Sequence, residues 1–339
     1  MRIGIVNDLP LARLALRRAV QSVPGYHVAW QAADGAEAVR RARLDPPDVI
    51  LMDLIMPRMD GVEATRRIMK DSPVAILVVT VSVETNFELV CEAMSHGGLD
   101  AVNTPTLAGG EVRGGEALLA RLARIDRSRS AAAPPPAPAC ALPPVRGKAS
   151  LLALGASTGG PEALARVLGE LPASFPAPVV VVQHIAAEFA GNLVAWLRGR
   201  CKLPVRPAHE GEVAPPGVIS VAATDEHLIL RNGMRFGIVR EPADYPFRPS
   251  VDVFFGSLAA SWPGTGVAVL LTGMGYDGAQ GLATLRGAGW YTLAQDQTTS
   301  VVYGMPKAAA ELRAACRVLP LAQMAGAILG RFETRQGGA

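Results

Sequence analysis

The chain has 339 residues, half of them hydrophobic, and this length predicts two domains. A net charge of only +3 gives no reason to expect nucleic acid as a partner, and the lack of both a membrane-spanning apolar run and a signal peptide predicts a cytoplasmic protein without membrane insertion. Four scattered cysteines without a C-x-x-C pair exclude a disulfide framework and a typical zinc site.

Residues 1–125 alternate strand-like and helix-like patterns. Strands are expected at Ile3–Val6, Val28–Ala32, Val49–Met52, Ala75–Val79 and Asp100–Asn103. Helices are expected at Leu9–Val20, Ala36–Arg43, Val62–Met69, Phe87–Met94 and Gly115–Ile125. Strand and helix units that alternate in this way predict an α/β, flavodoxin-like domain with a five-stranded parallel sheet.

Three polar residues directly follow strands of this expected sheet, namely Asp8, Asp53 and Thr80. Because the carboxyl ends of parallel strands meet at one edge, these side chains should share a site. Together with the run Leu54-Ile55-Met56-Pro57-Arg58-Met59-Asp60-Gly61 after Asp53, they make residues 1–125 resemble a two-component receiver domain. The resemblance implies that Asp53 accepts a phosphoryl group, that Asp8 and Asp53 hold Mg²⁺, and that Thr80 is the switch hydroxyl.

Two positions depart from the usual receiver pattern. Asn7 stands where receivers carry the first of two acidic residues, and Thr104 stands where they carry a lysine. Lys70 is the only lysine in residues 1–125, and it belongs to the third expected helix. A neutral amide attracts a hard dication less than a carboxylate does, so we expect weak Mg²⁺ binding and weak phosphorylation of Asp53.

A linker is expected at residues 126–147, between a receiver domain at 1–125 and a second domain at 148–339. The stretch 130–147 consists mostly of alanine and proline. Proline at this density cannot form helices or sheet ladders and favours extended polyproline conformations.

The second domain also alternates strand and helix patterns. Strands are expected at Leu151–Leu154, Val179–Val182, Val218–Val221, His227–Leu230, Val267–Leu271 and Tyr291–Leu293, with helices such as Pro161–Glu170 and Gly281–Gly287 between them. The pattern predicts a second, doubly wound α/β sheet.

Gly155, Ser157 and Gly159 follow the first of these strands and fit G-x-S-x-G, the nucleophile elbow. A serine hydroxyl is a weak nucleophile, so it must be exposed on a sharp turn where a base can reach it. The alternative is a glycine-rich helix start that packs closely or binds a phosphate.

A serine nucleophile needs an imidazole and a carboxylate. His184 follows Val179–Gln183 directly and should lie at the same sheet edge as Ser157. His227 begins a strand and should lie at the opposite edge, whereas His209 lies in a loop and stays open as a candidate. Asp277 lies in a glycine-rich turn after Val267–Leu271 and is the candidate acid.

The chain order Ser, His, Asp differs from the Ser, Asp, His order of ordinary α/β-hydrolases. The combination of receiver, linker and catalytic residues resembles the protein-glutamate methylesterases of bacterial chemotaxis, the CheB family, over nearly the whole chain. The stretches that carry the resemblance are Gly155–Pro161, Gln183-His184, Arg248–Asp252, Leu271–Gly278 and Gln295 through Pro306.

The resemblance implies a mechanism and partners. Ser157 would be the nucleophile, His184 the general base and acid, Asp277 the orienting carboxylate, and the Met274 N–H an oxyanion donor. The substrate would be a γ-glutamyl methyl ester on the cytoplasmic helices of a methyl-accepting chemoreceptor, which yields glutamate and methanol, and receptor glutamines could be deamidated. Catalysis would need no cofactor. A CheA-type histidine kinase would phosphorylate Asp53 in the presence of Mg²⁺ and so relieve inhibition by the receiver.

Two other functions fit the same residues. One is a receiver-linked serine hydrolase that acts on another ester or amide, and the other is a signalling adaptor without catalytic activity. The departures at Asn7 and Thr104 favour a lineage outside flagellar chemotaxis, such as the Wsp-type surface-sensing systems.

Overall fold

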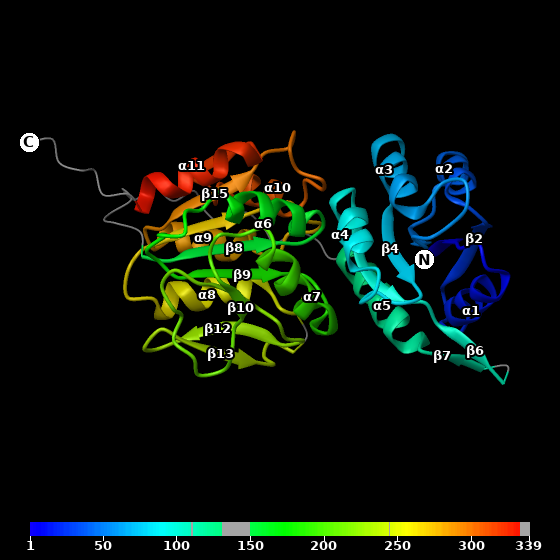
Figure 1. Cartoon of the computed structure of the whole chain (residues 1–339), viewed down its shortest axis with the longest axis horizontal. Helices are drawn as coiled ribbons and strands as arrows, with labels where there is room; N and C mark the ends of the chain where they lie inside the picture. Colours follow the sequence, from blue (N-terminus) through cyan, green and yellow to red (C-terminus); the bar gives the residue numbers. More distant parts are fainter. Residues whose placement is uncertain (110, 131–149, 244, 333–339) are drawn as a thin grey trace, which may run out of the picture. The chain divides into compact units, whose positions relative to one another are not determined.

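Strands rich in valine, isoleucine and leucine form a parallel sheet in each of the two units into which the chain divides, Met1–Ala131 and Ala132–Ala339 (Figure 1). The computed structural model describes residues 1–109, 111–130, 150–243 and 245–332. Helix α5 (Gly115–Ser130) extends into the range expected as linker, and the remainder of that linker lies outside the described residues.

The first unit has the predicted flavodoxin-like fold. Its five strands pair in parallel in the order β2-β1-β3-β4-β5. These strands are β1 (Arg2–Val6), β2 (His27–Ala32), β3 (Val49–Met52), β4 (Ala75–Thr80) and β5 (Gly98–Asn103). The helices besides α5 are α1 (Pro10–Gln21), α2 (Gly35–Leu44), α3 (Gly61–Asp71) and α4 (Phe87–Ser95).

Alternate strand residues of this sheet point into two separate cores. Ile5 and Leu51 belong to a core that includes residues of α1 and α5, whereas Ile50 and Met52 belong to a core that includes residues of α2 and α3. A short antiparallel hairpin that was not expected follows β5 and is formed by β6 (Thr106–Ala108) and β7 (Glu111–Arg113).

The second unit has a seven-stranded parallel sheet in the order β10-β11-β9-β8-β14-β15-β16. Its strands are β8 (Leu152–Ala156), β9 (Val179–Gln183), β10 (Val205–Pro207), β11 (Ile219–Val221), β14 (Val267–Leu270), β15 (Tyr291–Gln295) and β16 (Arg317–Leu319). From β8 the chain continues to β9, β10 and β11 on one side of the sheet, with β10 at the edge, and from β14 it continues to β15 and β16 on the other side. The boundary between β8 and β14 is therefore a topological switch point, where open α/β sheets bind ligands at their carboxyl edge.

Helices pack against this second sheet (Figure 1). They are α6 (Gly160–Gly169), α7 (Ala187–Arg198), α8 (Val251–Ser261), α9 (Ala279–Gly287), α10 (Met305–Glu311) and α11 (Leu321–Phe332). Phe254 and Phe255 of α8 share a fully buried core with Leu282 of α9 and with Ala153 and Leu270 of the sheet. Among the described residues, no helix is both long enough and apolar enough to cross a membrane.

The expectation that His227–Leu230 belongs to the second sheet is wrong. This segment is β12 (His227–Arg231), which pairs in antiparallel fashion with β13 (Arg235–Val239) in a separate two-stranded hairpin. The turn contains Asn232-Gly233, with a positive φ of 78° at Gly233. Asn-Gly between two apolar runs is a strong local hairpin signal, so the sequence carried the information that was missed.

Candidate active site

The turn between β8 and α6 presents Ser157. Gly159 adopts a left-handed φ of 75°, and a Cβ there would lie 2.6 Å from the Val301 side chain. The expectation that Ser157 is exposed is wrong, because the turns around it leave the residue only 7% exposed; its hydroxyl makes no hydrogen bond to any residue that the structure describes. The turn thus has the geometry expected of a nucleophile elbow.

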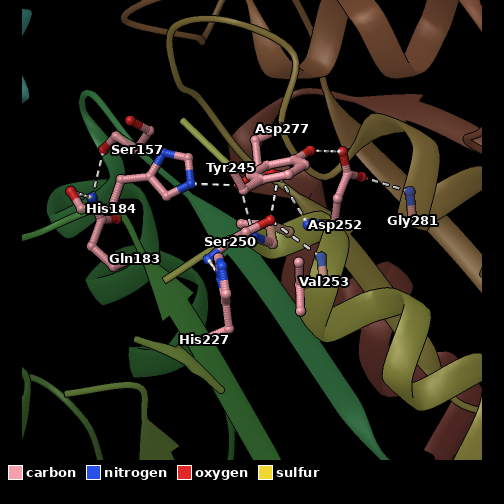
Figure 2. Close-up of polar contacts among 11 residues, drawn as sticks. Ser157, Gln183, His184, His227, Tyr245, Ser250, Asp252, Val253, Asp277 and Gly281 are labelled. Atoms are coloured by element: carbon pink, nitrogen blue, oxygen red, sulfur yellow. Dashed lines mark hydrogen bonds and ion pairs between the residues drawn. The ribbon is translucent and has the colours of Figure 1, made fainter. Parts of the chain in front are cut away.

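The side-chain amide of Gln183 joins this elbow to the neighbouring strand β9. Its Nε2 donates to the carbonyl oxygen of Ser157 at 2.8 Å and to that of His184 at 3.2 Å (Figure 2). Gly160 leaves space for the amide, because a Cβ at that position would lie 2.0 Å from Gln183 Oε1. This role of Gln183 could not be expected from the sequence, because the two carbonyl groups belong to residues that only the fold brings together.

His184 follows β9 and lies between Ser157 and Asp277 (Figure 2). Its Nε2 is 2.7 Å from Asp277 Oδ2, and since an ionised carboxylate only accepts hydrogen bonds, Nε2 carries the proton. The other nitrogen, Nδ1, is buried and has no hydrogen-bond partner among the described residues. Nδ1 is therefore the nitrogen that remains free to accept a proton.

The carboxylate of Asp277 is fully buried at the N-terminus of helix α8. It accepts hydrogen bonds from Ser250 Oγ at 2.8 Å and from the N–H groups of Val251 at 2.7 Å and Asp252 at 3.0 Å. Burial alone would raise the pKa of Asp277, but the hydrogen bond and charge of His184, together with the α8 amides, lower it. Asp277 is thus held as an anion.

A second carboxyl group, that of Asp252, lies near Asp277 and accepts hydrogen bonds from two other segments. The Gly281 N–H of helix α9 donates to its Oδ1 at 2.6 Å, and the Tyr245 hydroxyl donates to its Oδ2 at 2.8 Å (Figure 2). Burial and the neighbouring charge of Asp277 raise the pKa of Asp252. Asp252 therefore links the first turns of α8 and α9.

The ring of Phe247 covers one face of the His184 imidazole. The two rings are parallel within 7°, with centroids 4.8 Å apart, and the Tyr276 ring meets Phe247 edge-on at 6.2 Å. An aromatic ring in this position restricts the imidazole and excludes water from it. No sequence pattern pointed to this contact, because Phe247 and His184 lie far apart in the chain.

Met274 lies in the glycine-rich turn after β14. A Cβ at the preceding residue, Gly273, would lie 2.8 Å from the Ser157 Cβ, so this turn passes close to the serine. Within the described part of the chain, the Met274 N–H makes no hydrogen bond. It is therefore available to bind an oxyanion near Ser157.

The two other histidines of the second unit differ from each other. His209 is exposed on a loop. His227 is buried, and the expectation that it lies at the opposite sheet edge is wrong because β12 is not part of that sheet. Its Nδ1 is 3.2 Å from the donating N–H of Ser250, beside the Asp277 carboxylate. The sequence could have pointed to Ser250, because a serine directly before the apolar run that begins at Val251 is a typical helix N-cap.

In the first unit, Asp53 is buried at the carboxyl end of β3. Burial raises its pKa to about 6, and the charge of Asp8 contributes to the increase. Asn7 Nδ2 donates to Asp53 Oδ2 at 2.9 Å. Carboxylate oxygens suit Mg²⁺, but in the described ranges no third acidic, histidine or cysteine side chain joins Asp8 and Asp53. The residues fit a magnesium ion that is held weakly.

The other expected receiver residues lie at the ends of β4 and β5. Thr80 is buried, and its hydroxyl accepts a hydrogen bond from Asn86 Nδ2 at 2.9 Å. Thr104 donates its N–H to the Thr80 carbonyl, and its own hydroxyl has no partner among the described residues. Lys70 lies in the last turn of α3 and therefore toward the far edge of the sheet.

Comparison with known proteins identifies relatives for both units. Residues 152–328 match the CheB methylesterase family, and residues 3–107 match the response regulator receiver domain. The chain is 53% identical to protein-glutamate methylesterase/protein-glutamine glutaminase 3 of Burkholderia orbicola (strain AU 1054) over 98% of each chain. It is 52% identical to protein-glutamate methylesterase/protein-glutamine glutaminase 2 of Burkholderia lata, again over 98% of each chain.

A solved structure resembles the second unit. The crystal structure of the Thermotoga maritima CheB methylesterase catalytic domain aligns with a TM-score of 0.52 and 34% identity, and the alignment covers 54% of this chain and 99% of that one. The predicted fold of the second unit is therefore confirmed.

The close contact at Gly160 yields a testable prediction. Gly160→Ala should displace the Gln183 amide and lower stability by about 1–3 kcal/mol, because a Cβ there would lie 2.0 Å from Gln183 Oε1. Gly191→Ala on helix α7 is the matched control. Nothing lies within 4 Å of its Cβ position, so this change should be neutral or stabilising. Urea denaturation measures both, and equal stability of the two variants would contradict the role given to Gln183.

Proposed function

The chain belongs to the CheB family of protein-glutamate methylesterases, and from this we propose that Ser157, His184 and Asp277 hydrolyse γ-glutamyl methyl esters on a methyl-accepting chemoreceptor. The observation that carries the proposal is the buried hydrogen bond of 2.7 Å between His184 Nε2 and Asp277 Oδ2. This bond leaves Nδ1 of the imidazole as the only ring nitrogen able to take a proton from Ser157.

The reaction then proceeds in two halves. Ser157 Oγ attacks the ester carbonyl while its proton passes to His184 Nδ1, and the protonated imidazole is stabilised by the anionic Asp277. The Met274 N–H donates to the oxyanion, a contact of a type that stabilises the transition state by about 3–4 kcal/mol. Methanol leaves with the proton, and water activated by His184 then releases glutamate from the serine.

The same site supports deamidation of glutamine. An ester and a primary amide share the acyl group that Ser157 would attack, and they differ only in whether methanol or ammonia leaves with the proton from His184. The relatives carry both activities in their names. Release of methanol from methylated receptors distinguishes this function from hydrolysis of another ester, and any turnover argues against a non-catalytic adaptor.

The receiver unit supplies the regulation. A CheA-type histidine kinase is the proposed phosphodonor for Asp53, and Mg²⁺ held by Asp8 and Asp53 would neutralise charge as the phosphoryl group arrives. The Thr80 hydroxyl is the proposed switch. The Wsp-type lineage suggested by Asn7 and Thr104 stays a prediction.

The triad assignment predicts a graded loss of activity. Ser157→Ala and His184→Ala should each lower kcat for demethylation by about 10⁵–10⁶-fold, because members of such a unit act together. Asp277→Asn should be milder, about 10³–10⁴-fold, since His184 stays in place but loses its preferred tautomer.

The measurement is methanol release from methylated receptor. His209→Ala is the matched histidine control, because His209 is exposed on a loop, and it should keep full activity. Near-normal turnover by Ser157→Ala would exclude the triad.

The division into two units predicts that residues 148–339 fold and act alone. This fragment should show cooperative unfolding and should hydrolyse receptor esters faster than the unphosphorylated full chain, because the receiver no longer inhibits it. A phosphodonor should leave the fragment unaffected, which is the internal control. A rate equal to or below that of the full chain would argue against inhibition by the receiver.

The altered receiver predicts weak activation. Asn7→Asp combined with Thr104→Lys should tighten Mg²⁺ binding roughly tenfold, because a carboxylate replaces a neutral oxygen at a hard cation. The added lysine should also contact the phosphoryl oxygens and enlarge activation by small-molecule phosphodonors. Magnesium titration and demethylation rates measure the two effects.

Asp53→Asn is the control for this experiment, and it should abolish the phosphodonor response in both backgrounds. If the natural chain is activated as strongly as the double variant, Asn7 and Thr104 do not limit signalling.

A further inference from the structure

We propose that His227, which belongs to the β12–β13 hairpin and not to the catalytic sheet, is a positioning residue for the Asp277 carboxylate. The inference rests on the proposed esterase function. His227 is fully buried, and its ring lies on the far side of Ser250 from Asp277 (Figure 2). It touches none of the reacting atoms, so it would act through Ser250.

The hydrogen bonds of His227 specify one form of its ring. The Ser250 N–H donates to Nδ1 at 3.2 Å, so Nδ1 carries no proton. Nε2 lies 3.2 Å from the Pro242 carbonyl oxygen, an acceptor, so Nε2 carries the proton. Only the neutral ring protonated at Nε2 satisfies both contacts. Burial lowers the pKa of His227, which favours the same neutral form.

Ser250 connects His227 to the Asp277 carboxylate through hydrogen bonds. Its hydroxyl accepts a hydrogen bond from the Val253 N–H at 3.2 Å as the N-cap of α8, and it donates to Asp277 Oδ1 at 2.8 Å. The next two N–H groups of the chain, from Val251 and Asp252, also donate to Asp277. The backbone position of Ser250 therefore determines where three donors to the Asp277 carboxylate lie, namely the Ser250 hydroxyl and the N–H groups of Val251 and Asp252.

Loss of the Nδ1 acceptor would leave the Ser250 N–H buried without a partner. Such a donor costs about 1–3 kcal/mol, and the backbone would shift to relieve the cost. A shift at Ser250 moves the donors that hold Asp277, and Asp277 in turn holds His184. His227 therefore stands three hydrogen bonds away from the proposed general base, through Ser250 and Asp277.

Two amide variants separate positioning from simple core filling, because the smaller one keeps the acceptor and the larger one loses it. His227→Asn keeps an acceptor near the Nδ1 position, whereas His227→Gln keeps a donor near the Nε2 position and loses the acceptor for Ser250. We expect His227→Asn to keep kcat within about threefold of the natural chain. We expect His227→Gln to lower kcat about 10–100-fold, with little change in KM, because transition-state positioning is lost and substrate contacts are not.

A double-mutant cycle tests the route through Ser250. In a Ser250→Ala background, the hydroxyl that donates to Asp277 is absent while the N–H donors of Val251 and Asp252 remain, so the effect of His227→Gln on kcat should be smaller than in the natural chain, and the two effects should not be additive. Thermal unfolding of each variant, measured alongside methanol release from methylated full-length receptor, shows that the assay temperature lies below every transition.

The outcomes are distinct. Equal kcat for His227→Asn and His227→Gln, or fully additive effects with Ser250→Ala, would overturn the positioning role. If His227→Gln does not fold, His227→Leu takes its place, because leucine also lacks an acceptor for the Ser250 N–H; kcat of His227→Leu equal to that of His227→Asn would overturn the positioning role. The Ser157→Ala variant separates the two proposals. If Ser157→Ala stays active, the esterase assignment is wrong. If Ser157→Ala is inactive and His227→Gln is fully active, only the role of His227 is wrong.

Discussion

The candidate active site depends on one buried charge, the carboxylate of Asp277. An isolated carboxylate in a protein interior costs several kcal/mol, so the fold must supply compensating donors. The hydroxyl of Ser250 and the first amides of helix α8 do so, and His184 completes the set. The partial positive charge at the N-terminus of α8 adds to the stabilisation. Because the acid is held in this way, the imidazole is held with Nε2 protonated and Nδ1 free.

Sheet topology brings the other groups to the same place. Strands β9, β8 and β14 are neighbours, so the residues that follow them meet at the carboxyl edge beside the switch point. Close approach of the turns requires glycine at specific positions. A Cβ at Gly160 would strike the Gln183 amide, and one at Gly273 would strike both Ser157 and the sulfur of Met305. The three turns therefore depend on one another sterically as well as through hydrogen bonds.

Asp53 and Asp277 show how hydrogen-bond donors determine whether a buried carboxyl group is protonated or ionised. Burial raises the pKa of Asp53 to about 6, because its amide donors do not offset desolvation and the nearby Asp8 is also an acid. For Asp277, the hydrogen bond from His184 and the helix amides outweigh the same desolvation, and the pKa falls. The first state suits the proposed phosphoacceptor, and the second suits a permanent anion beside His184, the proposed general base.

The sequence by itself determined the two α/β units, all five strands of the receiver sheet, and the turns that carry Ser157, His184 and Asp277, because periodicity and glycine placement are local signals. It also held a local signal for the β12–β13 hairpin in Asn232-Gly233, although no hairpin was expected there. Only the tertiary structure decided that His227 and Ser250 lie behind Asp277, that Gln183 ties the elbow to β9, and that Phe247 covers His184. These contacts join residues far apart in the chain, and their register follows from how the hairpin and α8 pack against the sheet, which no local pattern encodes.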